Sequence, residues 1–156
     1  MKYPPNCGPY ILGVDPGKSG GLALCGGFGA DPKAWKMPET EADLVALLRG
    51  DSMPAGVFAY IEKVHAMPRQ GVSSTFKFGM NYGGLRMALV ACGIPFETVT
   101  PAKWQRAMSC LSKGDKNVTK RRAQELFPSI EVTHALADSL LIAEYGRRVR
   151  TQEIAA

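Results

Sequence analysis

Three acidic residues stand at places in this sequence where an ionised side chain is costly. Asp15 directly follows the apolar run YILGV, and Glu62 directly follows the apolar run VFAYI. Asp138 lies between apolar pairs and triplets, LA before it and LLI shortly after it. A buried carboxylate needs a cation or several hydrogen-bond donors to offset its desolvation. These three residues are therefore candidates for chemistry rather than for surface solubility.

Each acid also has a simpler interpretation. Asp15 precedes PGKSGG, and aspartate before Pro-Gly is favourable turn chemistry, so its carboxylate could cap an Asx turn. An exposed glutamate where a strand ends is the more frequent situation for Glu62. Because the three acids occur in comparable apolar settings, a shared functional site is favoured over three unrelated structural roles.

Carboxylates gathered at one place repel one another and raise each other's pKa values. Divalent cations with oxygen ligands remove that conflict, and such a site suits Mg²⁺ or Mn²⁺ better than Zn²⁺. Two such ions, about 3.5–4 Å apart, are the usual apparatus of phosphodiester hydrolysis. We therefore expect two Mg²⁺ or Mn²⁺ ions per active site and no small-molecule cofactor. His134 lies four residues before Asp138 and so shares its helix face.

Hydrophobic periodicity and turn residues predict an α/β protein. A strand, a Gly-rich turn and a second strand come first, followed by a third strand at residues 34–37 and a helix that begins at Thr40 and ends at Gly50. We then expect strands at 57–61 and 95–99, helices at 73–92, 102–108 and 119–127, a mobile polar loop at 109–117, and a last helix from a Thr133 N-cap to about residue 149.

The predicted helix at 73–92 contains Gly79, Gly83 and Gly84, which lower its helix propensity. Glycines inside a helix usually mean that another backbone comes close. That backbone belongs either to the sheet or to the same helix in a second subunit.

Positive charge is densest between residues 113 and 122. A solvated helix face is the simpler interpretation, but basic residues that flank a Gly-containing loop also suit phosphate contacts. The residues that we expect to bind DNA are Lys18, Lys63, His65, Arg69, Lys77, Lys113, Lys116, Lys120 and Arg121.

Length and composition set the outer limits. A chain of 156 residues is most simply one domain, with a net charge of +5 that favours a polyanionic partner. Its four cysteines are widely spaced, which argues against zinc and against disulfides. No apolar run reaches membrane-spanning length and no signal sequence is present, so we expect a soluble protein of the bacterial or phage-infected host cytosol, with no membrane partner.

The motifs, taken in order, resemble a known family. The segments GVDPGKSGG, YIEKVHAM, VTPAKWQRAM, KGDKNVTKRRAQELFP and HALADSLLIA resemble the RuvC-type Holliday junction resolvases of the retroviral integrase and ribonuclease H superfamily, especially the phage-encoded branch. The likeness extends from about Tyr10 to Tyr145. It implies a ribonuclease H-like five-stranded mixed sheet flanked by helices on both faces, and a homodimer that nicks two opposed strands of a four-way DNA junction.

The resemblance also implies residue roles. Asp15 would bridge the metals, Glu62 and Asp138 would be further ligands, and His134 would fill a fourth position that some members give to Asp. Lys113 and Lys116 would match basic residues of the substrate-binding loop. The products would be ligatable 5′-phosphate and 3′-hydroxyl ends.

Two departures from the family pattern stand out. The fourth ligand position usually lies three residues before the last aspartate, whereas His134 lies four before Asp138. Family members can also carry an aromatic residue three positions after the second acid, where this chain has His65.

Two other classes fit parts of the sequence. An acid before a Gly-rich hairpin also opens actin-like ATPases and sugar kinases, but these need two lobes and a second phosphate loop, for which this chain lacks the length and the motif. A non-catalytic branched-DNA-binding protein would gain nothing from carboxylates that face phosphates.

Overall fold

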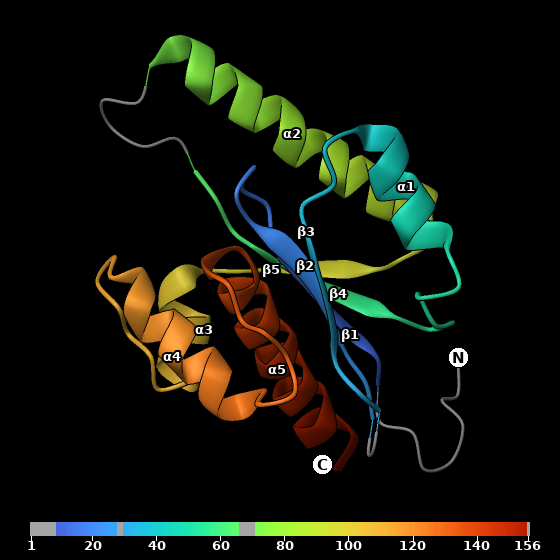
Figure 1. Ribbon diagram of the computed structural model, residues 1–156. Helices are drawn as coiled ribbons and strands as arrows, with labels where there is room; N and C mark the ends of the chain where they lie inside the picture. The colour runs from blue at the N-terminus through green and yellow to red at the C-terminus, as the bar shows by residue number, and fades with distance from the viewer. Residues whose placement is uncertain (1–8, 28–29, 66–70, 156) are drawn as a thin grey trace.

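The computed structural model describes residues 9–27, 30–65 and 71–155 and shows a five-stranded mixed sheet with helices on both faces (Figure 1). The strand order is β3-β2-β1-β4-β5. Strand β1 pairs antiparallel with β2 and parallel with β4, and β4 pairs parallel with β5. The strands are β1 (Ile11–Asp15), β2 (Gly21–Cys25), β3 (Lys33–Lys36), β4 (Phe58–Glu62) and β5 (Phe96–Val99). The predicted fold class is confirmed.

The helices divide between the two faces of the sheet. Helices α1 (Glu41–Arg49) and α2 (Val72–Ala91) cover one face, and α3 (Pro101–Ala107), α4 (Lys116–Leu126) and α5 (His134–Ala155) cover the other (Figure 1). Each layer has its own buried apolar cluster, one around α1 and α2 and one around α5. The central strands are buried on both faces, as the nearly continuous apolar runs predict.

Strand β1 alternates between the two layers. Ile11 packs in the cluster on the α5 side, whereas Leu12 and Val14 pack in the cluster on the α1 and α2 side. Because successive side chains of a strand point to opposite faces, Asp15 falls on the same face as Ile11. The strand therefore presents its terminal acid to α5.

Helix α5 lies directly on β1, and two glycines make this close approach possible. A Cβ atom at Gly13 would clash with the carbonyl oxygen of Ser139 and with the backbone of Ala143. A Cβ atom at Gly146 would clash with the side chains of Tyr60 and Ile11. The helix is thus fixed against the strand by backbone-to-backbone contact, which leaves little freedom in where its first turns lie.

Element boundaries differ from expectation at two helices. Helix α4 begins at Lys116, within the predicted loop, because the Asp115 side chain accepts from Asn117 N at 2.9 Å and caps it. Helix α5 continues to Ala155, beyond the expected end near residue 149. Thr133 precedes α5, but its hydroxyl is buried without a hydrogen-bond partner among the described residues, so the expected side-chain N-cap is wrong. The Thr40 cap of α1 is confirmed, with Asp43 N donating to its hydroxyl at 3.1 Å.

The internal glycines of α2 lie against no other backbone in the part of the chain that the structure describes. A Cβ atom at Gly79, Gly83 or Gly84 would meet none of its atoms within 4 Å. The sheet is therefore not their partner, and the interpretation that places the sheet there is wrong.

Among the described residues, no helix combines the length and apolar character that crossing a bilayer requires.

We predict that Gly13→Ala destabilises the protein by about 1–3 kcal/mol, because the added methyl forces α5 away from β1. The matched control is Gly71→Ala, whose added methyl meets no described atom within 4 Å. It should change stability by less than about 1 kcal/mol, the typical cost of exchanging an N-cap residue. Urea denaturation of both variants measures the two effects. Equal effects of the two changes would contradict the close approach.

Candidate active site

Asp15 and Glu62 end two neighbouring parallel strands. The register pairs Val14 with Ile61, so the two acids take equivalent positions one residue further along. Tyr60 packs on the α5 side and Ile61 on the opposite side. Alternation therefore directs Glu62, like Asp15, toward α5.

Asp138 reaches the same place from α5. The first turn of this helix lies over the start of β2, where a Cβ atom at Gly21 would lie 2.9 Å from the carbonyl oxygen of Ala135. The charge of Asp138 raises the pKa values of both Asp15 and Glu62. The structure thus brings the three predicted acids, which are far apart in the chain, within electrostatic range of one another.

Burial dominates the electrostatics of this acid cluster, by which we mean Asp15, Glu62 and Asp138. Desolvation is the largest cause that raises the pKa of each carboxyl group. It raises the pKa of Glu62 to about 8, with further increases from the charges of Asp15 and Asp138. The opposing effects are smaller, so the fold holds these groups in an environment that disfavours their ionised forms.

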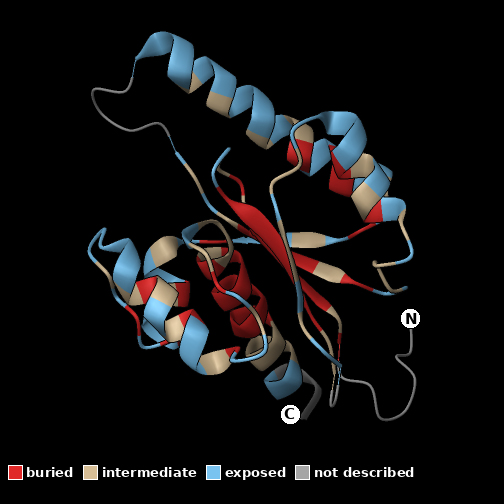
Figure 2. Ribbon diagram, in the orientation of Figure 1, coloured by how far each residue is buried: buried red, intermediate tan, exposed pale blue. Residues whose placement is uncertain are grey.

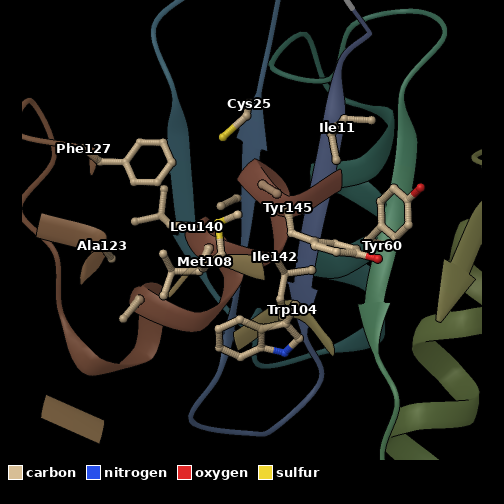
Figure 3. Close-up of a cluster of buried hydrophobic side chains, with 14 of the residues drawn as sticks. Ile11, Cys25, Tyr60, Trp104, Met108, Ala123, Phe127, Leu140, Ile142 and Tyr145 are labelled. Atoms are coloured by element: carbon tan, nitrogen blue, oxygen red, sulfur yellow. The ribbon is translucent and has the colours of Figure 1, made fainter. Parts of the chain in front are cut away.

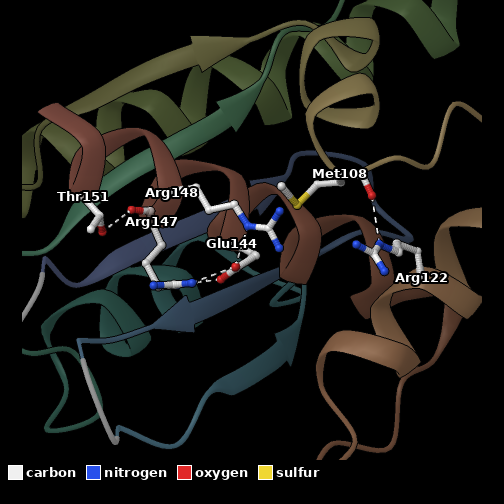
Figure 4. Close-up of polar contacts among 6 residues, drawn as sticks. All are labelled: Met108, Arg122, Glu144, Arg147, Arg148 and Thr151. Carbon is white, nitrogen blue, oxygen red and sulfur yellow. Dashed lines mark hydrogen bonds and ion pairs between the residues drawn. The ribbon is translucent and has the colours of Figure 1, made fainter.

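Another buried acid shows what a compensated carboxylate looks like in this fold. Glu144 of α5 is 7% exposed and receives Arg147 Nε at 2.7 Å and Arg148 Nε at 2.8 Å (Figure 4). Burial raises its pKa, but the hydrogen bonds from the two arginines outweigh burial and the pKa is lowered. Within the ranges that the structure describes, no arginine forms such an ion pair with Asp15, Glu62 or Asp138.

The turn after β1 shapes the surroundings of Asp15. Gly17 N donates to Asp15 Oδ1 at 3.2 Å, which is the Asx turn of the simpler interpretation. A Cβ atom at Gly20 would lie 2.7 Å from the carboxyl carbon of Asp15, so only glycine fits there. Asp15 therefore caps the turn and also belongs to the acid cluster.

Two polar side chains that sequence reasoning missed contact the acid cluster. The hydroxyl of Thr119 interacts with Asp138 and lowers its pKa, while also lying 3.2 Å from the carbonyl oxygen of Lys116. The indole N–H of Trp104 interacts with Glu62 and lowers its pKa, although this contact falls outside standard hydrogen-bond geometry. Trp104 is conspicuous as the one large apolar residue in the polar segment AKWQR, but sequence alone cannot show where its N–H points.

The donor set suits a hard divalent cation. Asp138 Oδ1 is buried without a hydrogen-bond partner, so it retains lone pairs for a ligand. Carboxylate oxygens are what Mg²⁺ and Mn²⁺ prefer. Among the described residues, no three His, Cys, Asp or Glu side chains are close enough to form a ready-made metal site. A metal site at this place would therefore need the carboxylates to turn toward one another, against their mutual repulsion.

Lys116, which the sequence predicts to bind DNA, lies beside the acid cluster. Its charge lowers the pKa values of Asp15, Glu62 and Asp138. It is the first residue of α4 and is exposed. Lys116 can therefore reach both the carboxylates and a phosphate that approaches them.

The loop before α4 is held by specific contacts. Ser112 N donates to Gln105 Oε1 at 3.3 Å, and Asp115 N donates to Ser112 O at 3.0 Å. Lys113 and Gly114 take positive φ angles of 49° and 95°, which form a sharp turn. This bonded turn presents the Lys113 side chain to solvent.

The remaining predicted residues lie around this edge of the sheet or beyond it. His134 begins α5, is exposed, and lowers the pKa of Asp138 by its charge. Lys18, Lys63, His65, Lys77 and Arg121 are exposed and Lys120 is half-buried, whereas Arg69 lies outside the described residues. Arg122, in the same basic stretch, donates from Nε to Met108 O at 2.9 Å (Figure 4). It also forms an ion pair with Glu125.

Sheet order, parallel central strands and helices on both faces define the class as a ribonuclease H-like α/β fold. Within that class the fold is RuvC-like. The chain is similar to the structure of Thermus thermophilus RuvC, with a TM-score of 0.62 and 18% identity over 92% of this chain and 96% of that one. It is also similar to T. thermophilus RuvC in complex with Holliday junction substrate, with a TM-score of 0.61 and 17% identity over the same shares.

Sequence comparison adds nothing to this result. No protein-family model matches the chain. No curated protein matches it either. At the identities given above, the structural likeness shows the fold, and placement in the phage-encoded branch stays a prediction.

We predict that the metal-free protein becomes less stable as pH rises from about 4.5 to about 8. In that interval the unfolded chain releases the proton of Glu62 while the folded chain retains it, because the pKa of Glu62 is raised to about 8 on folding. One such proton gives a slope of at most about 1.4 kcal/mol per pH unit. Denaturation in chelator at pH 5 and pH 8 measures it.

Glu62→Gln should flatten this pH dependence and stabilise the metal-free protein at pH 8. The control is Glu131→Gln, which changes an exposed carboxylate and should follow the wild type. A wild-type protein that is more stable at pH 8 than at pH 5 in chelator would contradict the prediction.

Proposed function

We propose that this protein is a structure-selective, metal-dependent endonuclease that resolves four-way and related branched DNA junctions by paired nicking of opposed strands. The observation that carries the proposal is the acid cluster, assembled from three chain segments at the carboxyl ends of neighbouring parallel strands. The fold supports it, since a similarly folded RuvC has been solved in complex with Holliday junction substrate.

Asp15, Glu62 and Asp138 would hold two Mg²⁺ or Mn²⁺ ions, with His134 as a fourth ligand beside Asp138. The ions would supply an activated water and stabilise the leaving 3′ oxygen, which gives 5′-phosphate and 3′-hydroxyl ends. The protein's own contribution is to hold unneutralised carboxylates at a fixed edge of the sheet. Their raised pKa values show that the ionised forms are disfavoured without a cation, and a bound cation would stabilise those forms.

Positive side chains around the acid cluster would bind the DNA backbone. Lys113 lies on the turn before α4, Lys116 is the first residue of α4, and Lys18 lies on the turn after Asp15. Phosphates bound there come close to the carboxylates. Lys116 would neutralise the scissile phosphate and also ease ionisation of the acids.

Paired nicking requires two active sites, and α2 offers a surface for a second subunit. Phe76 is 67% exposed, Met80 60% and Met87 63%, on the same stripe as the uncovered glycines (Figure 2). Small residues beside exposed apolar side chains permit close helix packing between subunits. We propose that α2 forms a homodimer interface.

Asp15→Asn and Asp138→Asn should each abolish cutting of a synthetic four-way junction in Mg²⁺, at least about 10²-fold, because each removes a metal ligand. Binding of the same junction in Ca²⁺ or chelator should be unchanged or tighter, since a charge that repels phosphate is lost. The control is Asp51→Asn, which alters an exposed acid away from the cluster. Wild-type cutting rates in either site variant would reject the nuclease; wild-type binding without any cutting would favour a purely DNA-binding protein.

Lys113→Ala combined with Lys116→Ala should weaken junction binding and reduce its salt dependence. Each phosphate contact contributes up to about 0.9 to the log–log slope, so the slope should fall by up to about 2. Lys33→Ala with Arg49→Ala removes the same charge from exposed positions of β3 and α1 and is the control. A salt slope that both pairs lower equally would place the first pair away from DNA.

Met80→Glu should convert the dimer to monomers in sedimentation velocity, because it buries a charge at the proposed interface. Ala46→Glu, at an exposed position of α1, should leave the sedimentation coefficient unaltered. A wild-type protein that sediments as a monomer at all concentrations would refute the homodimer.

A further inference from the structure

Trp104 is the buried residue of α3, and its surroundings explain only part of its chemistry. It is 0% exposed and packs in the α5-side cluster with Met108 and Ile142 (Figure 3). These apolar contacts account for the burial of the indole rings. They provide no acceptor for the indole N–H, whose nitrogen is buried without a hydrogen bond of standard geometry among the described residues.

The chain path carries Trp104 to the acid cluster. Val99 at the end of β5 pairs with Glu62, and Lys63 N donates to Val99 O at 2.7 Å. Helix α3 begins two residues later at Pro101. The helix is therefore anchored at the end of the strand that carries Glu62, and the Trp104 N–H interacts with the Glu62 carboxylate.

We propose that Trp104 is a positioning residue, whose indole N–H donates to Glu62 when that carboxylate turns to bind divalent cations. This inference rests on the metal site of the proposed function. A buried donor without a partner is rare in folded proteins and is costly to keep. The movement of Glu62 that metal binding requires would close the hydrogen bond.

Indole suits this task for a chemical reason. Its N–H is a donor only, so it cannot compete with Glu62 for a cation or accept the proton of the carboxyl group. It occupies one oxygen of the carboxylate and leaves the other for metal. Partners of this kind fix the orientation of metal-binding side chains, and their loss typically weakens metal affinity about 10- to 100-fold.

The test separates the N–H from the bulk of the ring. Trp104→Phe removes the donor and some volume, and β-(3-benzothienyl)alanine at position 104 replaces N–H with sulfur while keeping the two-ring shape. Mn²⁺ affinity is measured by electron paramagnetic resonance on the full chain, with the melting temperature as the check of folding. Tyr145→Phe, in the same core cluster on α5, is the control.

Both changes at position 104 should raise the Mn²⁺ Kd about 10- to 100-fold, and Tyr145→Phe should leave it within twofold of the wild type. Junction cutting by the two position-104 proteins should recover toward the wild-type rate at saturating Mn²⁺. If the benzothienyl protein melts like the wild type and binds Mn²⁺ with the wild-type Kd, Trp104 only fills the core and the inference is overturned.

Nuclear magnetic resonance gives a second readout that needs no variant with altered packing. The chain has two tryptophans, so its ¹⁵N spectrum has two indole cross-peaks, with Trp35 on β3 as an internal reference. Saturating Mg²⁺ should move the Trp104 indole proton downfield more than that of Trp35. An unmoved Trp104 proton in a metal-saturated protein would overturn the inference.

These outcomes separate the inference from the proposed function. A wild-type protein that binds Mn²⁺ but cuts no junction would reject the nuclease, while a lowered affinity at position 104 would still support the positioning role. A protein that cuts junctions, and that binds Mn²⁺ equally well with and without the indole N–H, would support the nuclease and reject the positioning role of Trp104.

Discussion

The backbone contact between α5 and β1 is the constraint on which the rest of the structure depends. Gly13 admits the helix at Ser139 and Ala143, and this contact determines where the preceding turn of the helix can lie. Asp138 stands on that turn. Since strand alternation turns Asp15 toward the same helix, a packing requirement at one glycine places two acids at one edge of the sheet. Glu62 joins them because β4 lies parallel beside β1.

The resulting acid cluster stores unfavourable electrostatic free energy. Glu144 shows that the same helix can bury a carboxylate at little cost when two arginines are within reach. The cluster receives instead the charge of Lys116 and polar contacts from Thr119 and Trp104, which do not offset its burial. The ionised carboxylates of the acid cluster are therefore disfavoured by burial. Either a bound cation or protonation of the carboxyl groups would relieve this unfavourable free energy.

Much of this could be predicted from the order of the residues. Apolar runs ending in Asp15 and Glu62 indicated buried strands with terminal acids, and the Thr40 cap followed from its spacing to Asp43. Thr133 takes the expected N-cap position, since Ala137 N donates to its carbonyl oxygen at 3.0 Å, but its hydroxyl makes no capping hydrogen bond among the described residues. Residue type predicts the position of a cap, whereas its side-chain hydrogen bond depends on where packing holds the hydroxyl. The glycines of α2 were expected to lie against the sheet or against a second subunit, and only the structure shows that no described atom comes within 4 Å of a Cβ placed at Gly79, Gly83 or Gly84.

The sequence by itself determined that buried strands end at Asp15 and Glu62 and that Asp138 shares a helix face with His134, because periods of two and 3.6 residues are local properties of strands and helices. Tertiary structure alone decided that β4 pairs with β1, that Lys116 stands beside the carboxylates, and that the N–H of Trp104 meets Glu62. These relations join residues many positions apart, and their distances follow from how whole helices and strands pack. Local patterns constrain such distances only weakly, since many packings satisfy the same periodicity.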